Sequence, residues 1–118
     1  MDASSVLVTG SSGTIGTALV ERLLAKGVDV TGVDRRPNPW SETIDDLTVQ
    51  LDLLDSNAAY ALPDDVDQIV HLAAHSRVQE LLEVPTLAGE NVQTTLTVLE
   101  HARRCDAAVV SASSREAY

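Results

Sequence analysis

The stretch Val6-Leu7-Val8-Thr9-Gly10-Ser11-Ser12-Gly13-Thr14-Ile15-Gly16 decides the fold of this chain. Its apolar start is typical of a buried strand, and three glycines at three-residue spacing follow. Ile15, Leu19 and Leu23 then recur every fourth residue, which predicts a helix over 14–26. A strand, a glycine turn and a helix N-terminus can hold a dinucleotide pyrophosphate, because glycine lacks a Cβ and the first helical N–H groups are free. The alternative is a tight turn without a ligand.

The composition is that of one acidic globular domain. The chain has 118 residues, 44% of them hydrophobic, and a formal net charge of −10. Lys26 is the only lysine among eight basic residues, against 18 acidic ones. We interpret this balance as halophilic adaptation to a salty cytoplasm, the alternative being an ordinary acidic protein. Without a basic patch, nucleic acid is not an expected partner.

Other features bear on compartment and metal content. No apolar run approaches the length of a membrane span, so no membrane partner is expected. The N-terminus has no basic region, which argues against a signal peptide. The one cysteine, Cys105, suits a reducing cytosol, and we read it as a small, partly buried residue after a helix. No ligand set stands at metal-binding spacing from His71, so we expect a cytoplasmic protein without a metal site.

Strand-like and helix-like segments alternate along the chain. Strands are predicted at 5–9, 29–33, 47–51, 68–73 and 107–111, helices at 14–26, 56–62 and 84–104, and an irregular loop at 35–43. This alternation predicts an α/β fold, a Rossmann-type doubly wound parallel sheet in the order 3-2-1-4-5. The runs 6–8, 69–70 and 109–110 lack polar alternation, as expected for strands covered on both faces. In the long helix, one face is predicted to carry Val92, Leu96, Leu99 and Ala102.

Asp34 ends the second predicted strand, shortly after the glycine turn. In this fold an acidic side chain there accepts hydrogen bonds from the adenosine ribose hydroxyls and favours NAD over NADP. Arg35 and Arg36 point to the opposite preference, because guanidinium groups bind phosphate. We favour NAD. The alternative for Asp34 is a turn-initiating residue, and for the two arginines a solvated loop.

Further motifs resemble those of one family, in order along the chain. They are Thr9-Gly10 at the head of T-G-x-x-G-x-x-G, His71-Leu72-Ala73-Ala74 after the fourth strand, Asn91-Val92 in the long helix, and Ser113-Ser114 after the fifth strand. Together they resemble the extended short-chain dehydrogenase/reductase family, the NAD-dependent epimerases and dehydratases of the UDP-glucose 4-epimerase type. The chain departs from the family pattern at Thr94, where glycine is usual.

The resemblance implies an NAD site and a sugar-contacting serine. Asp52-Leu53 would lie beside the adenine, residues 72–74 along the phosphate and ribose, and Ser114 at the reacting sugar hydroxyl. His71 is predicted to be a buried core histidine, while His75 and His101 are expected at the surface. The predicted cofactor residues are Gly10, Ser12, Gly13, Thr14, Ile15, Gly16, Asp34, Arg35, Asp52, Leu53, Leu72, Ala73 and Ala74.

The resemblance also implies chemistry that these residues do not complete. The family transfers hydride reversibly to NAD with the Tyr and Lys of a Y-x-x-x-K motif, but here the tyrosines are Tyr60 and Tyr118, and Lys26 is the only lysine. We therefore expect 1–118 to be an incomplete NAD-binding domain, truncated before the family's later strands and substrate domain. On this hypothesis it is the inactive N-terminal part of a homodimeric nucleotide-sugar epimerase or dehydratase. The alternative is a stand-alone NAD-binding sensor or subunit.

Overall fold

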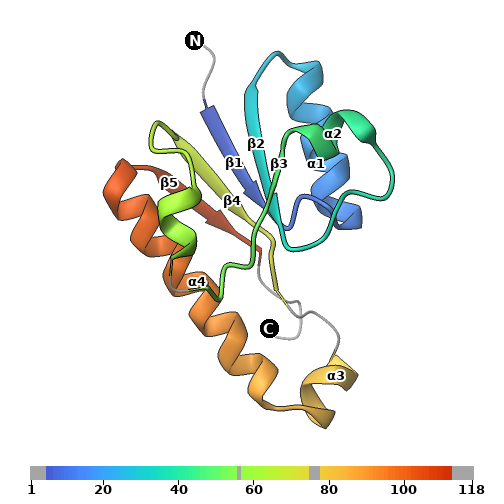
Figure 1. Ribbon diagram of the computed structural model, residues 1–118, viewed down its shortest axis with the longest axis vertical. Coiled ribbons are helices and arrows are strands. Elements are labelled where there is room, and N and C mark those ends of the chain that lie inside the picture. The colour runs from blue at the N-terminus through green and yellow to red at the C-terminus, as the bar shows by residue number, and fades with distance from the viewer. Residues whose placement is uncertain (1–4, 56, 75–77, 113–118) are drawn as a thin grey trace.

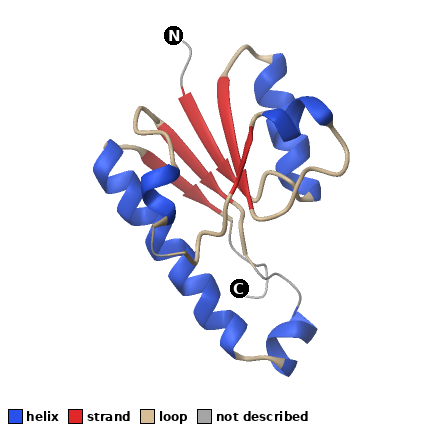
Figure 2. Ribbon diagram, in the orientation of Figure 1, coloured by secondary structure: helices blue, strands red, loops and turns tan. Residues whose placement is uncertain are grey.

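The computed structural model describes residues 5–55, 57–74 and 78–112. These residues form a five-stranded parallel sheet in the order β3-β2-β1-β4-β5, and the strands share one direction (Figure 2). The predicted fold class and strand order are therefore confirmed. The strands are β1 (Ser5–Thr9), β2 (Asp29–Asp34), β3 (Thr48–Gln50), β4 (Gln68–His71) and β5 (Ala108–Ser111).

Helices cover both faces of this sheet (Figure 1). They are α1 (Thr14–Ala25), α2 (Glu42–Asp46), the 3₁₀ helix η1 (Ala58–Ala61), α3 (Val78–Glu83) and α4 (Thr86–Cys105). Successive side chains of a strand point to opposite faces of the sheet. On one face Val6 and Val8 pack with Val20 of α1 and Ile44 of α2. On the other face Leu7 belongs to the core under η1 and α4. None of the described helices is both long and apolar enough to span a bilayer.

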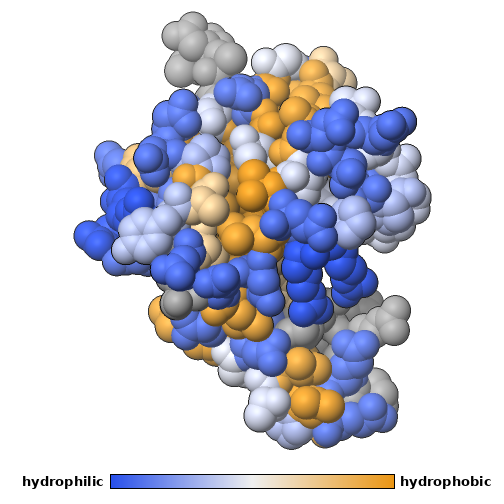
Figure 3. Space-filling model, viewed as in Figure 1, coloured by the Kyte–Doolittle hydropathy of each residue, from blue (hydrophilic) through white to orange (hydrophobic). Residues whose placement is uncertain are grey.

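Two helices depart from the predicted pattern. The predicted loop 35–43 runs into α2, where the Ser41 hydroxyl accepts a hydrogen bond from the Ile44 N–H (3.2 Å) and caps the helix. At five residues, α2 is too short to show a helical period. Helix α3 was not predicted either, and lies with the start of α4 at one end of the molecule. Apolar surface appears at that end in Figure 3, and exposed Leu82 and Val84 belong to this region.

The long helix is confirmed, but its predicted core face is largely wrong. Val92, Leu96 and Leu99 are 60%, 52% and 47% exposed, whereas Val98 and Ala102 are buried. The first half of α4 extends beyond the strands (Figure 1), so its apolar side chains have no sheet beneath them among the described residues. The helix contacts the sheet from Thr95 onward, and there Val98 turns inward together with the predicted Ala102.

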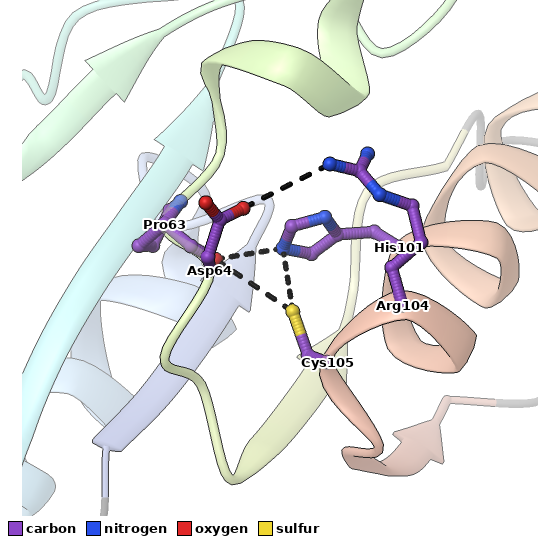
Figure 4. Close-up of polar contacts among 5 residues, drawn as sticks. All are labelled: Pro63, Asp64, His101, Arg104 and Cys105. Atoms are coloured by element: carbon purple, nitrogen blue, oxygen red, sulfur yellow. Dashed lines mark hydrogen bonds and ion pairs between the residues drawn. The ribbon is translucent and has the colours of Figure 1, made fainter.

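His101 corrects another expectation, because it is fully buried rather than at the surface. Its Nε2–H donates to the Pro63 carbonyl (2.8 Å), and the Sγ of half-buried Cys105 lies 3.4 Å from the same nitrogen (Figure 4). Nearby, Arg104 approaches the Asp64 carboxylate at 3.8 Å. These contacts fasten α4 to the segment between η1 and β4. A lone histidine on a helix carries no sequence signal for such a partner.

Strand β5 is not covered on both faces, contrary to expectation. Val109 packs against the core under η1 and α4, but Val110 is 62% exposed. Helix α1 contacts β1 and β2, and no described helix lies over β5 on that side of the sheet. An apolar run without polar alternation is therefore not sufficient evidence of a doubly covered strand.

Candidate functional site

Gly10 turns the chain across the carboxyl edge of the sheet at the end of β1. Its φ of +75° is a conformation that favours glycine, and its N–H donates to the Val33 carbonyl (2.8 Å). Its own carbonyl accepts from the Gly13 N–H (3.1 Å). A Cβ on Gly10 would lie 2.9 Å from the Ala73 nitrogen and the Leu72 carbonyl carbon. The turn and the segment after β4 are therefore in direct contact, and only glycine fits.

The next two glycines set the N-terminus of α1 against this turn. Gly13 is the N-cap residue, and no side chain caps the helix there. Gly16 is buried, and a Cβ on it would collide with the Gly10 carbonyl oxygen. Thr14 and Ile15 are exposed. First-turn N–H groups have no intrahelical acceptor, so this end of α1 can bind an anion that approaches the turn.

Asp34 is fixed beside the turn by main-chain amides. The Ser12 N–H donates to its Oδ2 (3.0 Å) and the Arg36 N–H to its Oδ1 (2.9 Å). The Ser12 hydroxyl in turn donates to the Arg36 carbonyl (2.9 Å). Each carboxylate oxygen keeps a further lone pair for a ligand hydroxyl. The exposed Arg35 lies next in the chain.

Asn38, which was not among the predicted site residues, anchors the loop after β2 to the turn. The residue is buried. Its Nδ2 donates to the Ser11 carbonyl (3.3 Å) and to the Thr17 hydroxyl (3.0 Å), while its Oδ1 accepts the N–H groups of Trp40 and Ser41 (both 2.9 Å). Between two prolines, this asparagine has the sequence appearance of an ordinary loop residue.

Asp52 and Leu53 follow β3 at the same edge of the sheet. The Asp52 side chain is exposed, and its Oδ1 accepts the Leu54 N–H (2.9 Å), which is an Asx turn. The Leu53 side chain lies in the core under η1 and α4. Any contact of Leu53 with a ligand would therefore come from its main chain.

Thr9 holds the segment after β4, and it was not predicted as a site residue. Its hydroxyl oxygen accepts the N–H groups of Leu72 and Ala73, both at 3.1 Å. His71 is 5% exposed, so the prediction of a buried core histidine is confirmed. Burial lowers the pKa of His71 below its usual 6.5. Ala74 is exposed beyond this anchored segment.

The fold thus brings several predicted residues to one edge of the sheet. The glycine turn, Asp34 and residues 72–73 lie at the carboxyl ends of β1, β2 and β4, which are neighbours in the sheet. Ser114 lies outside the described residues. Within the described part of the chain, no group of three His, Cys, Asp or Glu side chains is placed to hold a metal ion. A hollow of about 280 Å³ is lined by Asn91, Val92, Thr95 and Leu96, all from α4, and is a surface depression of that helix.

A parallel sheet with a glycine turn leading into a helix, and an acidic residue at the end of the second strand, is the architecture of Rossmann-type nucleotide-binding domains. Residues 6–118 match the NAD dependent epimerase/dehydratase family, and the chain belongs to that family.

Similar proteins include nucleotide-sugar enzymes. The chain is 32% identical over 118 residues to a UDP-N-acetyl-alpha-D-glucosaminuronate decarboxylase of Bacillus cytotoxicus, covering 95% of the chain and 37% of that protein. It is 33% identical to a UDP-glucose 4-epimerase of Mycolicibacterium smegmatis, covering 82% and 34%. The crystal structure of the Bordetella bronchiseptica enzyme WbmF in complex with NAD+ superposes with a TM-score of 0.80 at 28% identity, covering 96% and 37%. The chain spans about a third of the length of these relatives.

Proposed function

We propose that residues 1–118 are an NAD-binding domain, the N-terminal part of a nucleotide-sugar epimerase or dehydratase. The observation that carries this proposal is the Asp34 carboxylate, held by the Ser12 N–H against a glycine turn that opens α1. Similar proteins have been crystallised with NAD, among them WbmF and a UDP-glucose 4-epimerase of Thermus thermophilus. The single cysteine is compatible with a cytoplasmic protein.

In this proposal the segments at the carboxyl edge of the sheet each bind a different part of NAD. The N–H groups at residues 14–16 bind the pyrophosphate, and Gly10, Ser12 and Gly13 form the turn that it approaches. Asp34 accepts the adenosine ribose hydroxyls, with Arg35 beside them. Asp52 and Leu53 border the adenine, and residues 72–74 border the ribose and phosphate.

The chemistry proposed for the parent enzyme is reversible hydride transfer, which bound NAD supplies. The residues of this chain bind and orient the cofactor, and Ser114 would contact the reacting hydroxyl of the sugar. The parent is proposed to be a homodimer acting on a nucleotide-sugar.

The isolated chain is expected to show no sugar-dependent reduction of NAD. Lys26, its only lysine, is the C-cap of α1, at the opposite end of that helix from the glycine turn. Tyr60 lies on η1, where its ring stacks with Arg104 (5.3 Å). Lys26 and Tyr60 are therefore not placed together as a proton-transfer pair. Turnover of a UDP-sugar above that of heat-inactivated protein would contradict this expectation.

Binding of the reduced cofactor tests the proposal directly. Trp40 is the only tryptophan in the sequence. Its main-chain N–H donates to the side chain of Asn38, the residue that anchors the loop to the glycine turn. Energy transfer from Trp40 to the nicotinamide of NADH is expected to rise with NADH concentration and to saturate, with NADPH binding more weakly. The proposal would be overturned if folded protein gave energy transfer that does not saturate with NADH and is equally strong with NADPH.

We also propose that the acidic surface is an adaptation to high salt. With 18 acidic and eight basic residues, like charges repel one another at low ionic strength. Molar salt shortens the screening length to about 3 Å, from about 10 Å at 0.1 M. The urea midpoint of unfolding is expected to rise between dilute buffer and molar KCl, and equally in NaCl. A midpoint that is unchanged or falls would contradict the adaptation.

A further inference from the structure

The Thr9 hydroxyl stands at the centre of a buried hydrogen-bond chain. Its oxygen accepts the N–H groups of Leu72 and Ala73, and lies 2.6 Å from Nδ1 of His71. A hydroxyl has two lone pairs and one hydrogen. Because both lone pairs are occupied by amides, the hydrogen must point to Nδ1, which therefore carries none.

This assignment also fixes the other ring nitrogen of His71. A neutral imidazole with a bare Nδ1 carries its hydrogen on Nε2. Nε2 lies 3.2 Å from the Thr95 hydroxyl of α4, which accepts that hydrogen. The chain therefore runs in one direction, from Thr9 through His71 to Thr95. Its Thr9–His71 bond requires the neutral ring, because a protonated Nδ1 cannot accept a hydrogen bond.

The segment held by this chain forms one wall of the candidate cofactor site, because Leu72 and Ala73 lie against the backbone of Gly10. We propose that His71 is a positioning residue: by accepting the Thr9 hydrogen, it aims both lone pairs of that oxygen at Leu72 and Ala73 and sets the width of the cofactor site. The effect on cofactor affinity rests on the proposed function, whereas the effect on the two amides does not.

Protonation of His71 would disrupt this arrangement. A hydrogen on Nδ1 would face an oxygen whose lone pairs are both taken, so the Leu72 N–H would keep only the Thr9 carbonyl or the Ala73 N–H would lose the Thr9 hydroxyl. No charged group of the described neighbouring elements opposes or favours this change directly. Strands β1 and β5 contain none, and the nearest in α4 are Glu90 and Glu100, each five residues from Thr95.

Nuclear magnetic resonance tests the inference without any cofactor. The imidazole ¹⁵N shifts of His71 at neutral pH should show a protonated Nε2 and a bare Nδ1. The Ala73 amide is the cleanest reporter, because the Leu72 N–H also reaches the Thr9 carbonyl (3.1 Å), whereas among the described residues the Ala73 N–H bonds to the Thr9 hydroxyl alone. Its exchange with solvent should speed up as His71 protonates. A hydrogen on Nδ1 at neutral pH, or Ala73 exchange that does not follow His71, would overturn the inference.

Two variants separate positioning from packing. His71→Asn retains an acceptor near Nδ1, whereas His71→Leu fills the space without one. His71→Leu should speed Ala73 exchange and weaken NADH binding about tenfold, corresponding to one lost hydrogen bond. His71→Asn should show Ala73 exchange and NADH affinity close to those of the wild type. Neither should then depend on pH through residue 71. Equal affinity and equal Ala73 protection in both variants would reject the positioning role. If the wild type binds no NADH, the proposed function fails, and the tautomer and Ala73 exchange still decide the role of His71.

Discussion

Replacing Gly16 with alanine is expected to destabilise the fold and abolish measurable NADH binding. Gly16 lies in α1 with ordinary helical geometry, so the added methyl group costs nothing in backbone conformation. It would instead overlap the Gly10 carbonyl oxygen and come within 2.9 Å of the Ser11 Cα. All of these are backbone atoms, which cannot move aside as a flexible side chain can. Overpacking of this kind costs about 1–3 kcal/mol, and relieving it moves α1 away from the turn.

Gly89→Ala is the matched control. Gly89 is also helical, within α4, and a Cβ there meets no atom of the described residues within 4 Å. The same substitution should therefore raise stability by about 0.5–1 kcal/mol, the usual gain over glycine inside a helix. Urea unfolding and Trp40 energy transfer measure both variants. If Gly16→Ala matched Gly89→Ala in stability and bound NADH like the wild type, the close packing of the turn would be refuted.

The free energy of unfolding should decrease as the pH is lowered, and part of this decrease should depend on His71. Burial lowers its pKa, so between the usual value of 6.5 and the lower folded value the unfolded chain binds more protons than the native one. The free energy of unfolding therefore decreases as the pH falls below about 6.5. In His71→Asn this contribution to the dependence of the unfolding free energy on pH should be absent. Subtracting the two pH profiles removes the contribution of the carboxylates, which both proteins share. Identical slopes for both proteins above pH 5 would contradict the expectation.

Local sequence was enough to predict the parts of the fold that local physics determines. The apolar run before Gly10 forms β1, and the chain between successive strands is long enough for the crossovers of a parallel sheet. Once the strands are parallel, their carboxyl ends share one edge. The predicted placement of Asp34 and residues 72–73 near the glycine turn follows from that topology alone.

The unpredicted residues all act through partners distant in sequence. Thr9 meets His71 across 62 positions, Asn38 meets Ser11 across 27, and His101 meets Pro63 across 38. A buried polar side chain must find a partner, but the sequence gives no indication of which residue that is. The error over α4 has the same origin, because the length of helix that rests on the sheet is a tertiary property.

Asp34→Asn is the second substitution expected to have a large effect, and it acts on binding more than on folding. An asparagine keeps one acceptor oxygen but turns an N–H₂ group toward the Ser12 or the Arg36 amide, each of which now has a carboxylate acceptor. Charge-assisted hydrogen bonds contribute about 1.5–3 kcal/mol. Losing this contribution to the ribose hydroxyls should weaken NADH binding about 10- to 100-fold.

The response to NADPH separates charge from geometry at this position. Removal of the carboxylate removes its repulsion of a 2′-phosphate, and Arg35 and Arg36 follow directly in the chain, so the preference for NADH over NADPH should narrow. Asp29→Asn is the control, because it makes the same chemical change at the exposed opposite end of β2. Its affinity for both cofactors should stay within about twofold of the wild type, since an isolated surface charge contributes little. Equal losses in the two variants would mean that net charge, rather than the fixed carboxylate beside the glycine turn, governs binding.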